Sequence, residues 1–291
     1  MHVFQKGVNL NEVQLPLHKK GQKQGNKNAE NKQGWCLLCS CMEKSTGGKM
    51  PATRQEASRK ESGAWLQTLL VSSLGLRRED DVFRVATGLR LGVPICQPHK
   101  CQLCGSPVDR QGTHGLHCRK SLGRHPRHSA INDLIKRSLG SAKILAHLEP
   151  VGICRLVGKR PDGATVLPWR SGRILVWDAT CPDTFAPSHR DLATRGAGAV
   201  ADQAEERKKA KYAELATTHH FVPLAVETTD VFGSEGQMFF RELGRRIRDE
   251  SGEPLAYQYL LQRISVAVQQ GNAAAVLGTS SPTEFDFIYT Q

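Results

Sequence analysis

Residues 160–178 read RPDGATVLPWRSGRILVWD, and this stretch decides the fold. Its two apolar runs, 164–167 and 174–177, predict strands, and residues 169–172 are typical of the turn of a hairpin. A hairpin centred near residue 170 places Asp162 opposite Asp178, with roughly 5 Å between their Cβ atoms. Two carboxylates at that spacing suit a shared Mg²⁺, because this cation prefers oxygen ligands. Two unrelated aspartates that cap or solvate turns are the alternative.

The elements outside the hairpin predict a mixed α/β fold. Further strands are expected over 144–148, 151–156 and 221–226. Apolar residues at helical spacing predict helices over 129–140, 200–217, 239–247 and 255–277, and two shorter helices between residue 62 and Gly92. Strands interleaved with helices in this order are typical of one sheet with helices packed on it.

The helix expected over 200–217 carries a lysine among small and apolar residues. Lys208 shares a face with Ala204 and Tyr212, so it is expected to point toward the sheet. A lysine there could orient an attacking water or stabilise the charge that develops on a phosphate. Lys209 and Lys211 are the other candidates for this catalytic lysine. The alternative is that Lys208 has no catalytic role and extends along the surface to solvent.

Nine cysteines with CxxC spacing favour reduced thiols over disulfides. Cys101, Cys104, His114 and Cys118 form the pattern C-x2-C-x9-H-x3-C, which can close a tetrahedron around a structural zinc ion. His117 is an alternative to His114 as the histidine ligand. Two further candidate ligands, Cys96 and His99, lie nearby in the sequence. The alternative to a zinc site is a group of thiols without metal. Cys36, Cys39 and Cys41 lack a second ligand pair and are interpreted as unpaired cysteines in a disordered segment.

The charge distribution predicts an anionic partner. The net charge is +12, and residues 96–145 contain nine Lys and Arg against two acidic residues, a net +7 (9 − 2). This segment is the best candidate for contacts with phosphates, through Arg119, Lys120, Arg124 and Arg127. No apolar run approaches the roughly 20 residues of a membrane span, and the first residues have no secretory signal.

Together these motifs resemble the C-terminal region of site-specific non-LTR retrotransposon polyproteins, with its zinc knuckle and restriction-like endonuclease. The matching stretches are CQLCGSPVDRQGTHGLHC, RHSAIND, LEPVG, RPDG, ILVWDAT and KKAKY. The resemblance implies a PD-(D/E)xK-type mixed sheet flanked by helices and preceded by a small zinc knuckle. It also implies that Asp162 and Asp178 bind catalytic Mg²⁺, that Lys208 and Tyr212 complete the active site, and that Arg127 and His128 lie close to DNA. One departure is Thr180, which stands where the wider nuclease superfamily has a lysine.

The expected organisation is a disordered basic tail over 1–55, a helical linker over 60–95, a CCHC knuckle over 96–127 and an endonuclease domain over 128–280. The expected function is Mg²⁺-dependent nicking of DNA by a protein that also contains a structural zinc ion. The expected partner is DNA, or RNA, and no small-molecule cofactor is expected. The expected location is nuclear or cytoplasmic. The alternatives are an inactive zinc-knuckle module that binds nucleic acid and a truncated element copy without function, since no Tyr-x-Asp-Asp motif of a reverse transcriptase occurs.

Overall fold

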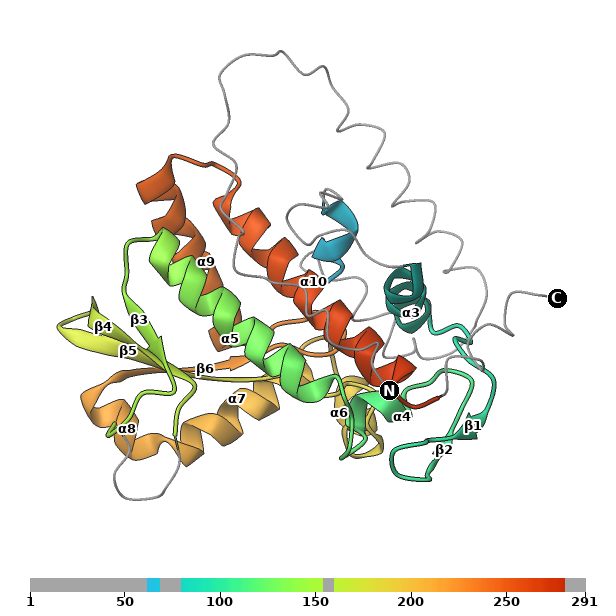
Figure 1. Cartoon of the computed structure of the whole chain (residues 1–291). Coiled ribbons are helices and arrows are strands. Elements are labelled where there is room, and N and C mark those ends of the chain that lie inside the picture. The colour runs from blue at the N-terminus through green and yellow to red at the C-terminus, as the bar shows by residue number, and fades with distance from the viewer. Residues whose placement is uncertain (1–61, 69–79, 154–159, 281–291) are drawn as a thin grey trace, which may run out of the picture.

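The computed structural model describes residues 62–68, 80–153 and 160–280 of the chain. Its centre is a four-stranded sheet in the order β3-β4-β5-β6 (Figure 1). The strands are β3 (Ala146–Leu148), β4 (Gly163–Arg170), β5 (Arg173–Thr180) and β6 (His220–Ala225). Strand β4 is antiparallel to both β3 and β5, and β6 runs parallel to β5. The predicted mixed α/β class is therefore confirmed.

Helices cover both faces of this sheet (Figure 1). On one face lie α5 (Arg124–Ser141), α9 (Ser234–Ser251) and α10 (Ala256–Leu277), and on the other lie α7 (Ala199–Lys211) and α8 (Ala213–Thr218). The alternation of side chains along β5 explains both layers, because Leu175 and Trp177 belong to the large core with α5, α9 and α10. Val176 points the other way, into a small cluster with Tyr212 and Leu215 from the α7–α8 side.

The predicted hairpin is confirmed. Gly163 pairs with Trp177 across β4 and β5, and the N–H of Asp162 donates to the carbonyl of Trp177 at 3.0 Å. The same register places Asp162 beside Asp178 at the open end of the hairpin. At the closed end, Ser171 and Gly172 both have positive φ, as the tight turns that connect twisted strands require.

Three elements differ from the sequence prediction. Residues 151–153 form a bend and 154–159 lie outside the described residues, so no strand is described over 151–156. The short β3 begins after Lys143, which has a positive φ of 57°. The helix expected over 200–217 is broken at Tyr212, whose buried ring lies 4.9 Å from that of Phe221. Packing of this ring against β6 outweighs the uninterrupted helical pattern.

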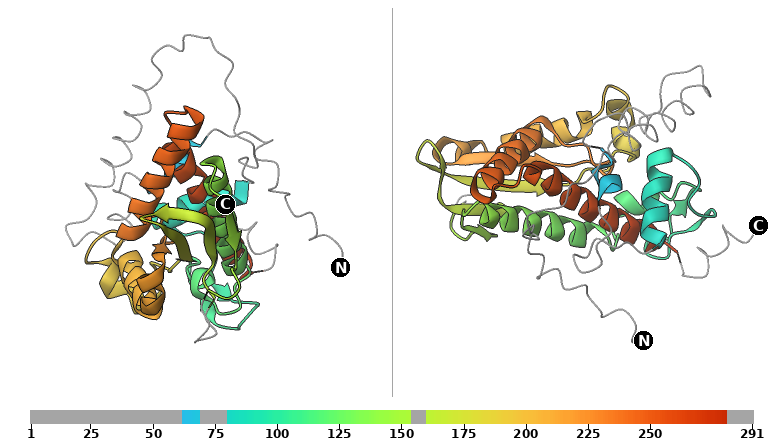
Figure 2. Two further views of the ribbon diagram at one scale, coloured as in Figure 1. Left: turned by 90° about the vertical axis from the view of Figure 1, so that its left-hand side faces the viewer. Right: turned by 90° about the horizontal axis from the view of Figure 1, so that it is seen from above.

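The N-terminal described segments pack on the C-terminal helix. The elements η2 (Ala64–Gln67), α3 (Asp80–Leu91) and α4 (His114–His117) all contact α10. A second apolar cluster joins side chains from 85–118 to Ala273, Ala275 and Val276 of α10. Figure 2 shows α10 alongside α5 as well. Where it is described, the segment expected to be a linker is thus part of the packed body.

The remaining short elements are β1 (His99–Lys100), β2 (Pro107–Val108), η4 (Pro187–His189) and α6 (Arg190–Ala193). Strands β1 and β2 pair to form a separate two-stranded sheet next to α4. Among the described helices, none has the length and apolar character that a membrane crossing needs.

Candidate metal centre and active site

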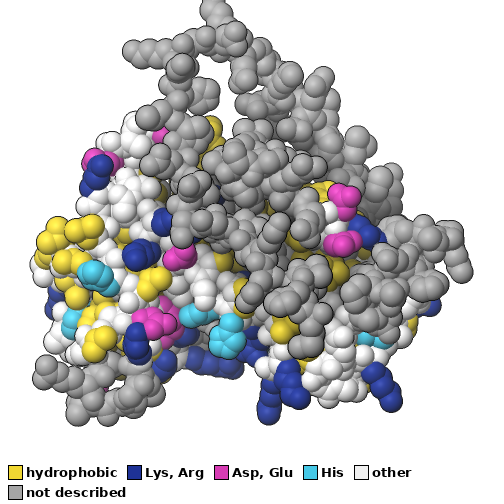
Figure 3. All heavy atoms as spheres, in the orientation of Figure 1, with side chains coloured by type: hydrophobic (Ala, Val, Ile, Leu, Met, Phe, Trp, Pro, Cys, Tyr) yellow, Lys and Arg dark blue, Asp and Glu magenta, His cyan; other side chains and the backbone are white. Residues whose placement is uncertain are grey.

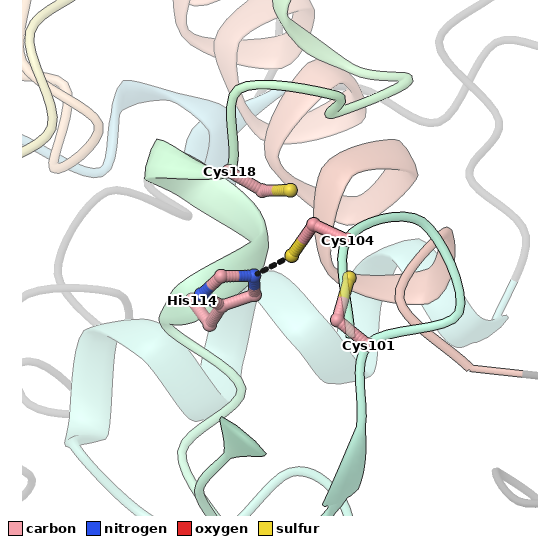
Figure 4. A group of neighbouring side chains, drawn as sticks. All are labelled: Cys101, Cys104, His114 and Cys118. Carbon is pink, nitrogen blue, oxygen red and sulfur yellow. Dashed lines mark hydrogen bonds between the residues drawn. The ribbon is translucent and has the colours of Figure 1, made fainter. Parts of the chain in front are cut away.

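Three cysteines and one histidine converge between β1 and α4 (Figure 4). Cys101 and Cys104 flank a tight turn, His114 is the first residue of α4, and Cys118 directly follows that helix. Their ligand atoms all lie within 4.8 Å of one another, and the Cys104 Sγ is 3.1 Å from the His114 Nε2. Among the described residues, no other group of three or more His, Cys, Asp or Glu meets this criterion. A Cys3His set of this kind could hold zinc in a closed, structural site.

Hydrogen bonding at the exposed Cys104 favours the thiolate that a metal requires. The side chain and backbone of Ser106, followed by His114, lower the pKa of Cys104 to about 6. Gly105 directly follows Cys104 and closes this turn, because its N–H donates to the carbonyl of Cys101 at 2.7 Å and its φ of 77° is a conformation that favours glycine.

The alternative ligands considered from sequence lie elsewhere. His117 points to Asp183, whose Oδ2 is 2.9 Å from its Nδ1, so the structure selects His114. The Cys96 thiol donates to the carbonyl of Asp109 at 3.2 Å, and burial raises its pKa to about 11. His99 bonds to the carbonyl of Gln97 through Nδ1.

The second site lies at the open end of the β4–β5 hairpin. The Asp162 Oδ2 accepts the N–H of Ala179 at 2.6 Å and lies 3.0 Å from the His128 Nε2. Burial opposes ionisation of Asp162, but the hydrogen bond and charge of His128 outweigh it and hold the pKa of this carboxyl below its usual range. The pKa of His128 is raised, first by its hydrogen bond to Asp162 and against the effect of burial.

Two lysines of α7 reach the neighbouring carboxylate. Lys208 forms an ion pair with the Asp178 Oδ1 and also donates to the carbonyl of Ala179 at 3.3 Å. The Lys211 Nζ is 3.3 Å from the Asp178 Oδ2 and donates to the Tyr212 hydroxyl at 2.7 Å. The side chain of Asp178 is only 5% exposed, so both lysines compensate a buried charge. The direction expected for Lys208, toward the sheet and its aspartates, matches these contacts.

Lys209, one residue further along α7, is oriented differently. Its Nζ pairs with Glu206 and with Glu235 of α9, at 2.8 and 2.9 Å. Lys209 is therefore a natural control for Lys208, because it has the same chemistry on the same helix but contacts other carboxylates.

Asn132 is a member of this site that sequence reasoning missed. Its amide oxygen accepts the indole N–H of Trp177 at 2.9 Å, which turns its amide nitrogen toward both ring nitrogens of His128, at 3.3 and 3.4 Å. The only available signal was helical spacing, because Asn132 follows His128 by four residues on α5.

The predicted phosphate contacts fall into two groups. Arg119, Lys120 and Arg124 are exposed near the start of α5, as contact with a phosphate would require. In Figure 3, Lys and Arg side chains gather along the lower edge of the molecule, close to this end of α5. Arg124 precedes His128 by one helical turn, so this basic surface adjoins the aspartate site.

The prediction that Arg127 contacts DNA does not fit its surroundings. Its side chain is 3% exposed and donates through Nη1 to Asn272 of α10. The Cβ of Arg127 lies against Gly271, where an added methyl would come within 2.4 Å of it. Arg127 therefore holds α5 to α10, and a positive charge in the sequence is not sufficient to place it on the surface.

Comparison with known proteins gives no family assignment. No protein-family model matches the chain, and no curated protein sequence matches it.

Proposed function

We propose that this chain is a metal-dependent DNA endonuclease with a PD-(D/E)xK-like core, similar to the endonuclease region of non-LTR retrotransposon polyproteins. The observation that carries the proposal is the meeting of His128, Asp162, Asp178 and Lys208 at the open end of one hairpin. These residues come from α5, β5, α7 and the segment before β4, so the cluster is a product of the tertiary fold.

The donor set fits Mg²⁺, the cation proposed for this site. Asp162 and Asp178 are neighbours in the hairpin register and supply carboxylate oxygens, the ligands that Mg²⁺ prefers. A bound divalent ion would supply an activated water and would neutralise charge on the scissile phosphate.

The chain's own residues would perform the other tasks of the reaction. Lys208 carries its ammonium group to the carboxylate of Asp178 and is the proposed stabiliser of charge on the phosphate. Tyr212 supports this arrangement, because its hydroxyl accepts from Lys211 and donates to the carbonyl of Arg160 at 3.2 Å. The exposed Arg119, Lys120 and Arg124 would position the DNA backbone without reading its sequence. The proposed location is the nucleus, where DNA is the partner.

Nicking of a supercoiled plasmid in Mg²⁺ tests this proposal. Asp178→Asn retains the size of the side chain and removes its charge, and it should abolish conversion to the open circle. Lys209→Ala is the matched control and should retain the activity. A wild-type protein that contains zinc and binds DNA but leaves the plasmid intact would refute the endonuclease assignment.

A second candidate function is a nucleic-acid-binding module on an inactive nuclease scaffold. It is favoured by one observation: two lysines, Lys208 and Lys211, already neutralise Asp178. DNA or RNA binding without cleavage in the same assay would support this candidate.

A further inference from the structure

His128 and Asp162 form a contact that the proposed Mg²⁺ site does not use. The His128 Nε2 lies 3.0 Å from the Asp162 Oδ2, and the His128 side chain is 42% exposed. The pair therefore lies at an open surface of the active site and can be reached from solvent.

The spacing of this pair is that of two adjacent ligands in an octahedron. With metal–ligand bonds of about 2.1 Å at 90°, adjacent ligand atoms lie about 3.0 Å apart. A cation could therefore bind both atoms in place of the hydrogen bond, once the imidazole turns so that its Nε2 lone pair points at the ion instead of at the Asp162 oxygen. Water can complete the coordination, since hard divalent cations at phosphate-processing sites commonly retain several waters.

The surrounding residues already fix both groups. The Ala179 N–H holds the same Asp162 oxygen at 2.6 Å, and the amide of Asn132, oriented by Trp177, lies against the imidazole of His128. Such outer contacts orient metal ligands and raise metal affinity. Asp178, by contrast, is occupied by Lys208 and Lys211, so it is the weaker starting point for a cation.

We propose that His128 and Asp162 are adjacent protein ligands of the active-site cation, and that the imidazole makes this site select Mn²⁺ over Mg²⁺. The inference rests on the proposed endonuclease function and deepens it by adding His128 to the ligands and by making Mn²⁺, not Mg²⁺, the preferred ion. Its basis is ligand chemistry: Mg²⁺ strongly prefers oxygen ligands. Mn²⁺ suits the same carboxylate and water ligands, but as a first-row transition ion it also binds imidazole nitrogen, although more weakly than the later ions of that row.

Pulsed electron paramagnetic resonance of bound Mn²⁺ tests the inference directly. The protein is first loaded with zinc so that the cysteine cluster is filled, and Mn²⁺ is then added at less than one equivalent. We expect a nitrogen hyperfine coupling in the wild type, its loss in His128→Ala, and its retention in His125→Ala. His125 is the matched control, an exposed histidine on the same helix.

A second measurement does not depend on a substitution. Labelling the wild-type protein with ¹⁵N-histidine should replace the ¹⁴N pattern with that of ¹⁵N.

A third measurement compares metal affinities. His128→Ala should lower the Mn²⁺ affinity by about 10- to 100-fold, with a much smaller effect on the Mg²⁺ affinity. Zinc content and the urea midpoint of the variant establish that it is folded.

The possible results separate this inference from the proposed function. Nicking with Mg²⁺ or Mn²⁺ but no histidine coupling would overturn the inference and leave the endonuclease in place. Coupling to His128 without nicking under any metal would support the metal site and refute the endonuclease. Coupling that persists in His128→Ala would overturn the assignment of the ligand.

Discussion

Replacing Lys208 by Met tests the charge arrangement around Asp178 independently of any activity. The substitution retains most of the aliphatic stem and removes the ammonium group from a pair whose side chains are 19% and 5% exposed. Removing one partner of a buried ion pair lowers the free energy of unfolding by about 3–5 kcal/mol when the other charge is left without a partner.

The structure indicates that the cost here is smaller. Lys211 remains 3.3 Å from the other oxygen of Asp178, although at 36% exposure its side chain is partly screened by water. We therefore expect Lys208→Met to lower the free energy of unfolding by about 1–3 kcal/mol, less than the full cost of an unpaired buried charge. Removing both lysines should cost more than the sum of the two single losses, because Asp178 then has neither of these partners.

The assay is urea unfolding of the two single variants, the double variant and each of them combined with Asp178→Asn. With the carboxylate neutralised, either lysine substitution should have little effect on the urea midpoint. The same proteins in the plasmid assay should show that Lys208→Met loses nicking while DNA binding is retained, since a contact made in the transition state is removed. Additive losses in the double variant, or an equal effect of Lys208→Met with Asp178 and with Asn, would refute the reasoning.

Three other predictions address the zinc cluster, the DNA surface and a buried acid. Purified protein should contain about one zinc per chain by metal analysis. Cys104→Ser should lose the zinc and also the fixed packing of the α3–α4 region, which near-ultraviolet circular dichroism measures. A fully folded, metal-free protein would contradict this prediction. DNA affinity should fall steeply with salt, and Arg124→Ala should reduce that salt dependence because Arg124 is exposed. Arg127 is buried, so Arg127→Ala should mainly lower the urea midpoint of unfolding. A salt-independent affinity would be inconsistent with phosphate contacts. Burial raises the pKa of Asp230 to about 7, despite hydrogen bonds from Gln269 and Ser265 and the charge of Arg90. The folded state thus retains a proton that the unfolded chain releases near pH 4, so stability should fall as the pH rises from about 4 to about 7. Asp230→Asn should remove this fall in stability with pH and should raise the urea midpoint of unfolding at pH 8. If the stability of the variant depends on pH as that of the wild type does, Asp230 is not its cause.

The hairpin and the cysteine cluster could be predicted because local patterns determine them. Two apolar runs on either side of a short turn specify which residues pair, so Asp162 and Asp178 could be placed as neighbours. The spacing of the cysteines similarly follows from the reach of a small loop around one ion. The catalytic and DNA-binding roles attached to these residues remain predictions.

Other features depend on contacts between distant segments and could not be derived in this way. A charged side chain such as Arg127 is exposed in most proteins, and its burial arises because Gly271 and Asn272 of α10 provide space and a hydrogen-bond acceptor. The break at Tyr212 likewise depends on β6, which the helical pattern of 200–217 does not include. The sequence pattern offers Lys211 only as a substitute for Lys208, but the two lysines are three residues apart on α7 and both contact Asp178.

The contacts of α10 also affect the order in which the protein can fold during its synthesis. Translation produces the zinc-cluster segment well before α10, yet the apolar side chains around that segment are covered by Ala273, Ala275 and Val276. A zinc ion, if bound, would gather its four ligands on the nascent chain, but the apolar surface beside them would stay uncovered until α10 leaves the ribosome. Contacts between segments so far apart in sequence are slow to form. Early metal capture would therefore protect a part of the chain whose packing partner is made much later.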